Sequence, residues 1–257
     1  KDDGSLVIDI GGAWQPGQPT RSLYHYELLI ALCREVGFHL AQEFYWYNPA
    51  KLPSPAEWVN VRKVRVKDAV NCLWWLSKTP WSKANNQNVL QEYSPDMHRL
   101  LKRGYRIKQQ PSGHHITHKF KDNGGSIPPN LITCGNNDAN GYYLSRCNAN
   151  GKKPHPARFP VQVPLFFVRF LTEAGDLVLD PFAGSNTTGE ICEAEGRNWI
   201  AFELDKEYLE TSRYRFESRP ADKPAPATNG EAPNRAKKRG RSSNRSSYAN
   251  GQPELFP

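Results

Sequence analysis

Residues 177–189 read LVLDPFAGSNTTG, and this stretch decides the fold. The apolar run ends in Asp180, a loop of Pro, Gly and Ser follows, and a helix start comes after the loop. That order predicts a strand whose carboxyl end opens into a ligand crevice, the usual binding position of an open α/β sheet. Residues 200–203 (IAFE) predict a second short strand, which also ends in an acid, Glu203.

The two acids restrict the kind of ligand that can bind. Glu203 can accept hydrogen bonds from the two hydroxyls of a ribose, as an acid does in the dinucleotide-binding fold. The loop lacks the Lys of a phosphate-binding P-loop, and Asp180 would repel a pyrophosphate. We therefore expect a nucleoside with a cationic or zwitterionic tail rather than a nucleotide phosphate.

The loop resembles the cofactor loop of a known family. The pattern DPF-x-GS-x-TT over residues 180–188 is similar to the S-adenosylmethionine-binding loop of the DNA amino methyltransferases, which methylate cytosine N4 or adenine N6. The resemblance implies S-adenosylmethionine as the cofactor, with Ser185 and Thr187 bonding its methionine part. It also implies that Phe182 lies near the adenine or the sulfonium and that Glu203 holds the ribose.

Two further features bear on this site. The family's usual Gly between Ser and Thr is Asn186 here, and because Asn tolerates left-handed backbone angles, the turn can survive. Upstream, residues 153–160 (KPHPARFP) and the helical apolar spacing that follows resemble the segment that closes over the methionine end. Taken alone, this segment favours a satisfied loop histidine and a surface charge, and its place next to the loop favours the functional interpretation. The expected cofactor-binding residues are Asp180, Pro181, Phe182, Gly184, Ser185, Asn186, Thr187, Thr188, Glu203, His155 and Arg158.

Composition limits the alternatives. The chain has 257 residues, enough for one α/β domain with a sizeable core, and a net charge of +8. The five cysteines are odd in number and never at Cys-x-x-Cys spacing, which argues against a disulfide framework and a zinc site, so we expect no metal. No stretch is apolar for 18 residues and there is no secretory signal, so we expect a cytoplasmic protein without a membrane segment.

The layout predicts an α/β protein with a Rossmann-like S-adenosylmethionine-dependent methyltransferase sheet, interrupted by a mostly irregular target-recognition segment. Strands are expected over 5–10, 38–47 and 69–77, and helices over 22–36 and 95–104. The first strand, helix and strand suggest a right-handed crossover on a parallel sheet. The expected parts are a catalytic-half remainder (1–80), the target-recognition segment (81–152), a cofactor-binding half (153–218) and a disordered basic tail (219–257).

The catalytic half of the family's chemistry is not found in this sequence. The family motif is a polar residue, two prolines and an aromatic residue. Residues 126–130 (SIPPN) have no polar residue directly before the two prolines and no aromatic residue after them. The resemblance puts the motif a few tens of residues before Lys1, and the chain starts without Met, so we expect a piece of a longer protein. The catalytic residues stay unknown, and we expect no turnover from the chain as it stands.

Basic residues suggest where DNA binds, because Lys and Arg neutralise phosphates and Arg also reads guanine. One further basic cluster could equally contact phosphate or be structural; it consists of Arg62, Lys63, Arg65 and Lys67. The residues expected to contact DNA are His114, His115, His118, Lys119, Lys121, Arg103 and Arg106.

The resemblance implies a site-specific, cytosine-N4 DNA methyltransferase of a restriction-modification system, acting on double-stranded DNA with a flipped target base. An adenine-N6 enzyme and a non-catalytic DNA-binding remnant of a methylase stay open, and the oligomeric state is not predicted.

Overall fold

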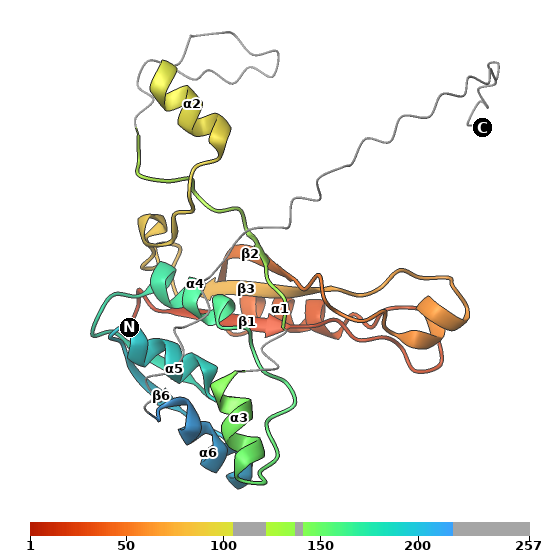
Figure 1. The fold of residues 1–257 in the computed structure, drawn as a ribbon. Coiled ribbons are helices and arrows are strands. Elements are labelled where there is room, and N and C mark those ends of the chain that lie inside the picture. Colours follow the sequence, from red (N-terminus) through yellow and green to blue (C-terminus); the bar gives the residue numbers. More distant parts are fainter. Residues whose placement is uncertain (105–121, 137–140, 218–257) are drawn as a thin grey trace, which may run out of the picture. The chain divides into compact units, whose positions relative to one another are not determined.

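The computed structural model describes residues 1–104, 122–136 and 141–217 (Figure 1). Its larger sheet has four strands in the order β1-β3-β2-β4. Strand β3 runs antiparallel to both β1 and β2, and β4 runs parallel to β2. The strands are β1 (Ser5–Ile10), β2 (His39–Tyr47), β3 (Val70–Ser77) and β4 (Leu131–Thr133).

The predicted parallel sheet is wrong for the first three strands, because one of them is antiparallel to the other two. Strands β1 and β2 are parallel to each other, but β3 lies between them. The sequence of β3 explains its central place, because five consecutive residues, Leu73–Ser77, are buried and a strand covered on both faces reads as a continuous apolar run. Helix α1 (Tyr24–Arg34) connects β1 and β2, lies within the predicted range 22–36, and is followed by Gly37 at φ +87°.

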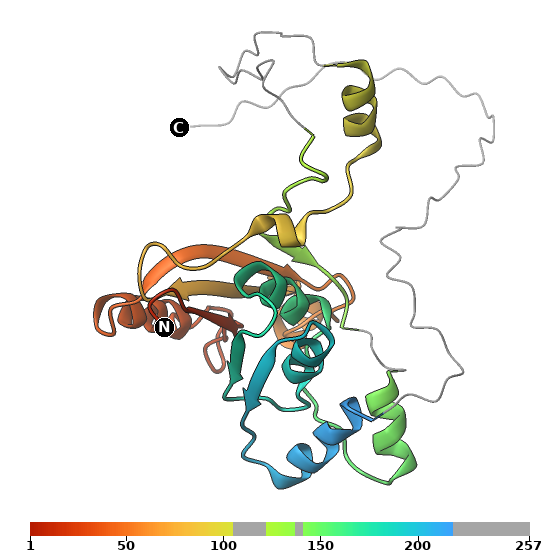
Figure 2. The same cartoon turned by 90° about the vertical axis from the view of Figure 1, so that its left-hand side faces the viewer.

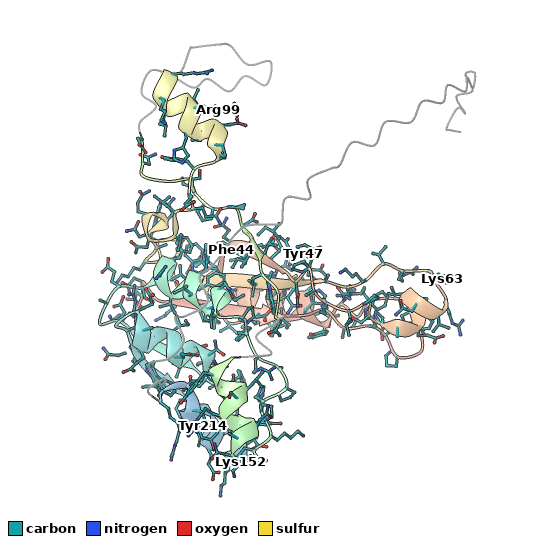
Figure 3. The ribbon with its side chains drawn as sticks, viewed as in Figure 1. Phe44, Tyr47, Lys63, Arg99, Lys152 and Tyr214 are labelled. Atoms are coloured by element: carbon teal, nitrogen blue, oxygen red, sulfur yellow. The ribbon has the colours of Figure 1, made fainter. Side chains whose placement is uncertain are left out.

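The main core lies between this sheet and helix α4 (Gln162–Leu171). Phe44 of β2 meets Phe167 of α4 edge to face, with ring centroids 5.2 Å apart. Figure 3 labels Phe44 beside this helix. The buried members of the cluster are Phe44, Trp46, Leu73, Trp75, Val163, Phe167 and Leu171. Helix α4 is thereby fixed against the larger sheet.

The opposite side of α4 supports the second sheet, in which β5 (Leu177–Asp180) and β6 (Asn198–Ala201) run parallel. Val168 of α4 packs with Ile191 and Cys192 of helix α5 (Thr187–Ala194). Figure 2 shows α4, β5 and β6 from the side, together with helices α3 (Tyr142–Ala149) and α6 (Lys206–Ser212). Helix and strand alternate here in the order α4, β5, α5, β6, α6.

Within 81–152 the structure has more order than the sequence predicted. Helix α2 (Pro95–Arg103) is confirmed, with the Ser94 hydroxyl accepting from Met97 N at 3.2 Å. Strand β4 and helix α3 were not expected. Short helical turns lie at Glu57–Val61, Asn86–Val89 and Arg213–Arg215. The division at residues 81 and 152 stays a prediction, and none of the described helices is long and apolar enough to span a membrane.

Candidate functional site

The carboxyl ends of β5 and β6 bring two acids to one edge of the sheet. Asp180 is the last residue of β5 and pairs with Ala201, the last residue of β6. Beyond the strands, Phe202 N donates to Asp180 O and Ala183 N donates to Phe202 O, both at 2.9 Å. These bonds hold Asp180 and Glu203 on neighbouring turns. Asp180 ends β5 as predicted, whereas β6 covers Asn198–Ala201 rather than 200–203, so Glu203 lies two residues beyond the strand.

Both carboxylates fasten the loop between β5 and α5. Asp180 accepts from Phe182 N at 3.0 Å and from the Thr188 hydroxyl at 2.7 Å, each on a different oxygen. Glu203 accepts from Gly184 N at 2.7 Å on one oxygen and from Asp205 N at 2.9 Å on the other. Since an ionised carboxylate has about four acceptor positions, each acid retains capacity for donors of a ligand.

The amides of this loop point toward the protein. The N–H groups of Phe182, Ala183, Gly184 and Asn186 all donate to acceptors of the chain itself. Phosphate-binding loops instead direct their amides toward the anion. The loop is therefore not a phosphate-binding loop, as Asp180 and the missing Lys already indicated.

Two residues with positive φ make the turn. Gly184 has φ +54°, and Asn186 has φ +58° and ψ +45°, the left-handed conformation that the sequence allowed for it. The Asn186 side chain then caps α5 by accepting from Gly189 N at 3.0 Å. A Cβ on residue 189 would overlap this side chain, so the Asn at 186 and the Gly at 189 form a matched pair.

The predicted upstream segment lies against the loop. A Cβ on Gly184 would lie 3.0 Å from the His155 ring, and that ring meets Tyr208 edge to face with centroids 4.6 Å apart. Arg158 donates to the carbonyl of His155 at 2.5 Å. The structure thus brings His155 to the loop directly, and Arg158 supports the backbone of His155.

Other predicted residues differ in accessibility. Ser185 and Thr187 are only 2% and 3% exposed, whereas Phe182 is 88% exposed. Beside the loop lies a pocket of about 190 Å³, lined by Gly184, Asn186 and Glu203 among others. Ligand pockets usually measure about 300–1,000 Å³, so this pocket can hold only part of a nucleoside-sized ligand.

Arg215 is a residue of this site that the sequence analysis missed. It donates to the Ser185 carbonyl at 2.5 Å and to the Ser185 hydroxyl at 2.8 Å. It also forms an ion pair with Glu190 at 2.6 Å, and its side chain is only 5% exposed. Its guanidinium stacks over Tyr143 of α3, 4.6 Å from the ring centroid. Arg215 therefore ties the loop, α5 and α3 together.

A second missed residue, Asp9, lies near the carboxyl end of β1. Burial raises the pKa of Asp9 to about 6, and the Asn71 side-chain amide donates to its carboxylate at 3.1 Å. In the sequence this residue reads as one polar position of a short strand. A perturbed pKa at a strand end is typical of functional sites and of structural networks alike.

Of the residues expected to contact DNA, the structure describes Arg103, which lies in the last turn of α2. On the same helix, Arg99 pairs with Asp96, and Figure 3 labels Arg99. The remaining expected residues lie outside the described ranges: Arg106, His114, His115, His118, Lys119 and Lys121. The expected basic tail, residues 219–257, also lies outside them.

A comparison with known families agrees with this geometry. A family model described as DNA methylase matches residues 1–213. The chain belongs to the DNA methylase family. This methylase is 55% identical over 220 residues to the type II methyltransferase M.PvuII of Proteus hauseri, a match that covers 84% of the chain and 66% of the relative. It is 36% identical over 76 residues to M.HpaI of Haemophilus parainfluenzae, which covers 30% of the chain and 24% of the relative.

The fold is shared with a solved methyltransferase. The structure of a PvuII DNA methyltransferase, described as cytosine-N4-specific, matches with a TM-score of 0.69 and 48% sequence identity. The match covers 85% of this chain and 65% of that one. The chain thus spans slightly less than two thirds of the methyltransferase that it resembles.

Proposed function

We propose that this DNA methylase transfers a methyl group from S-adenosylmethionine to the exocyclic N4 of cytosine in duplex DNA, as the modification part of a restriction-modification system. The observation that carries the proposal is its 55% identity to M.PvuII, together with the match to a structure described as cytosine-N4-specific. An adenine-N6 target is the second candidate of the same chemistry, and a non-catalytic DNA-binding remnant is the third. Binding to chromosomal DNA would place the protein in the cytoplasm.

The strand-end residues fit S-adenosylmethionine, which when bound supplies the electrophilic methyl group. Glu203 retains acceptor positions for the ribose hydroxyls. The negative charge of Asp180 favours a ligand with a cationic sulfonium and ammonium. The exposed Phe182 ring offers an apolar surface for the adenine. The inward-facing loop amides support a cofactor without phosphate groups.

Methyl transfer is a displacement in line with the leaving sulfur, so the protein contributes mainly by positioning the two reactants. The fixed turn at Gly184 and Asn186, capped onto α5 and held by Arg215, supplies a rigid support for one reactant. The other reactant is a base that must leave the duplex stack before its amine can meet the methyl group. Residues 81–152 remain the segment proposed to choose the DNA site.

The test is the product formed in DNA. The complete reading frame that encodes this chain should be expressed in a host without methylated amino groups in its DNA, and the nucleosides analysed by mass spectrometry. N4-methylcytosine is the expected product. N6-methyladenine would establish the second candidate. Unmodified DNA, despite soluble protein that binds DNA, would favour the remnant.

A further inference from the structure

The connection between β2 and β3 forms a projecting arm, residues 48–69, closed at its base where Asn48 N donates to Ala69 O at 2.9 Å. Figure 1 shows the arm extending past the end of the sheet, and Figure 3 labels Lys63 at its outer end. The arm begins where β2 ends, which is also the end of the sheet at which β1 finishes, because these two strands are parallel.

The arm is held by its own hydrogen bonds and by the loop that follows β1. Asp68 N donates to Ser54 O at 3.1 Å, and the Lys67 ammonium donates to Pro49 O at 3.2 Å. From the neighbouring loop, Pro19 O accepts from Arg65 at 2.9 Å, and Arg21 forms an ion pair with Asp68. The arm therefore presents its surface in a defined shape.

The charge of the arm is unbalanced. It contains five Lys or Arg and two Asp or Glu, whereas residues 1–218 contain twenty-six and twenty-three. Arg62 pairs with Glu57 at 2.7 Å. In the described ranges, no carboxylate lies within ion-pair distance of the other four cations of the arm, which are Lys51, Lys63, Arg65 and Lys67.

Outside the arm and one further basic stretch, residues 1–218 carry a net negative charge. Residues 99–121, within the proposed recognition segment, contain seven Lys or Arg and no acid. Outside that stretch and the arm, residues 1–218 contain fourteen Lys or Arg and twenty-one Asp or Glu. The net positive charge of residues 1–218 therefore lies in these two basic stretches, which favours their contact with a polyanion.

The arm also exposes apolar side chains that nothing in the described structure covers. Leu52 is 79% exposed, Val61 67% and Val66 86%. Cations without an ion-pair partner, interleaved with exposed aliphatic groups, match a backbone of phosphates joined by sugars, in which charged and apolar surfaces alternate.

We propose that the arm lies along the sugar–phosphate backbone of duplex DNA, as a second contact separate from the proposed recognition segment. This inference rests on the proposed function only in taking duplex DNA as the partner. Phosphate contacts position a protein on DNA without reading its sequence. The arm accordingly contributes affinity and orientation, and the choice of site lies elsewhere.

The experiment measures duplex binding by fluorescence anisotropy between 50 and 200 mM salt, with a duplex of arbitrary sequence. The test variant is Lys51→Gln/Lys63→Gln. One control is Arg34→Gln, which removes an exposed cation near the start of β2, about 30 Å along that strand from the arm. A second control, Glu57→Gln/Arg62→Gln, removes the paired charges of the arm and leaves its net charge unchanged.

The plot of log K against log salt has a negative slope, and each lost phosphate contact makes it less steep by about 0.9. The double variant should therefore have a slope that is less steep by about 1.8. Its deficit in affinity relative to the unmodified protein should be about tenfold smaller at 200 mM salt than at 50 mM salt. Both controls should keep the slope of the unmodified protein. Melting temperatures confirm that every variant is folded.

The outcomes separate the two proposals. An unmodified protein that does not bind duplex DNA at low salt overturns the proposed function. DNA binding with an unchanged slope in Lys51→Gln/Lys63→Gln overturns the arm contact alone. Loss of self-association in sedimentation, again with an unchanged slope, would instead make the arm an interface between copies of this chain.

Discussion

Replacing Arg215 with Ala should destabilise the fold more than any other single change beside the loop. The substitution removes two hydrogen bonds to Ser185, the ion pair with Glu190 and the stacking on Tyr143. Because the side chain is 5% exposed and that of Glu190 is 19% exposed, water cannot readily replace these contacts.

The size of the effect follows from this burial. Breaking a buried ion pair by removing one partner costs about 3–5 kcal/mol. The lost bonds to Ser185 belong to the same network, so their cost is not added separately. We expect Arg215→Ala to lower the free energy of unfolding by about 3–5 kcal/mol. Arg215→Lys keeps the charge and loses the planar fork, and should cost about half as much.

Urea unfolding, followed by circular dichroism, gives both values. The matched control is Arg213→Ala, an exposed residue of the same short turn, which should change the free energy by no more than about 0.5 kcal/mol. If Arg215→Ala or Arg215→Lys proves as stable as Arg213→Ala, the contacts of Arg215 are not what holds the loop. The Lys variant keeps the test decisive if the Ala variant does not fold.

Three further outcomes are expected. Asn186→Ala should cost about 2 kcal/mol in urea unfolding, from left-handed strain and the lost cap, and Asn186→Gly less than about 1 kcal/mol. Since burial raises the pKa of Asp9 to about 6, the folded state binds the extra proton, and the contribution of Asp9 to stability should fall by roughly 2–3 kcal/mol from pH 4 to 7. The difference in stability between the unmodified protein and Asp9→Asn, measured at both pH values, should change by this amount. Exchanging residues 81–152 with those of a related methylase should move the methylated sites, and unchanged sites by sequencing would make the segment structural.

The sequence predicted the part of the site that local rules govern. Asp180 and Glu203 were located because an acid directly after an apolar strand must lie at the strand's carboxyl end. The left-handed conformation of Asn186 was foreseen because so few residue types tolerate it. These conclusions depend on neighbours within a few positions of the chain.

Contacts between distant residues were not predictable. Arg215 lies thirty positions from Ser185 and reads like any other basic residue in a polar stretch. Strand periodicity identified β1, β2 and β3 but carries no information on pairing, which is why the antiparallel β3 between β1 and β2 was missed. Strand β4 has only three residues, too few to show an alternating pattern.

The most direct test of the central claim is a calorimetric titration of S-adenosylmethionine into the protein from the complete reading frame, with Glu203→Ala compared to it. Lys152→Ala, which removes an exposed ion pair with Glu210, is the control. Loss of charged hydrogen bonds should weaken binding by roughly 1–3 kcal/mol, about 5- to 150-fold, in Glu203→Ala. The control should bind like the unmodified protein. Equal affinity in all three proteins, with Glu203→Ala folded, would contradict the assignment of the cofactor to the ends of β5 and β6.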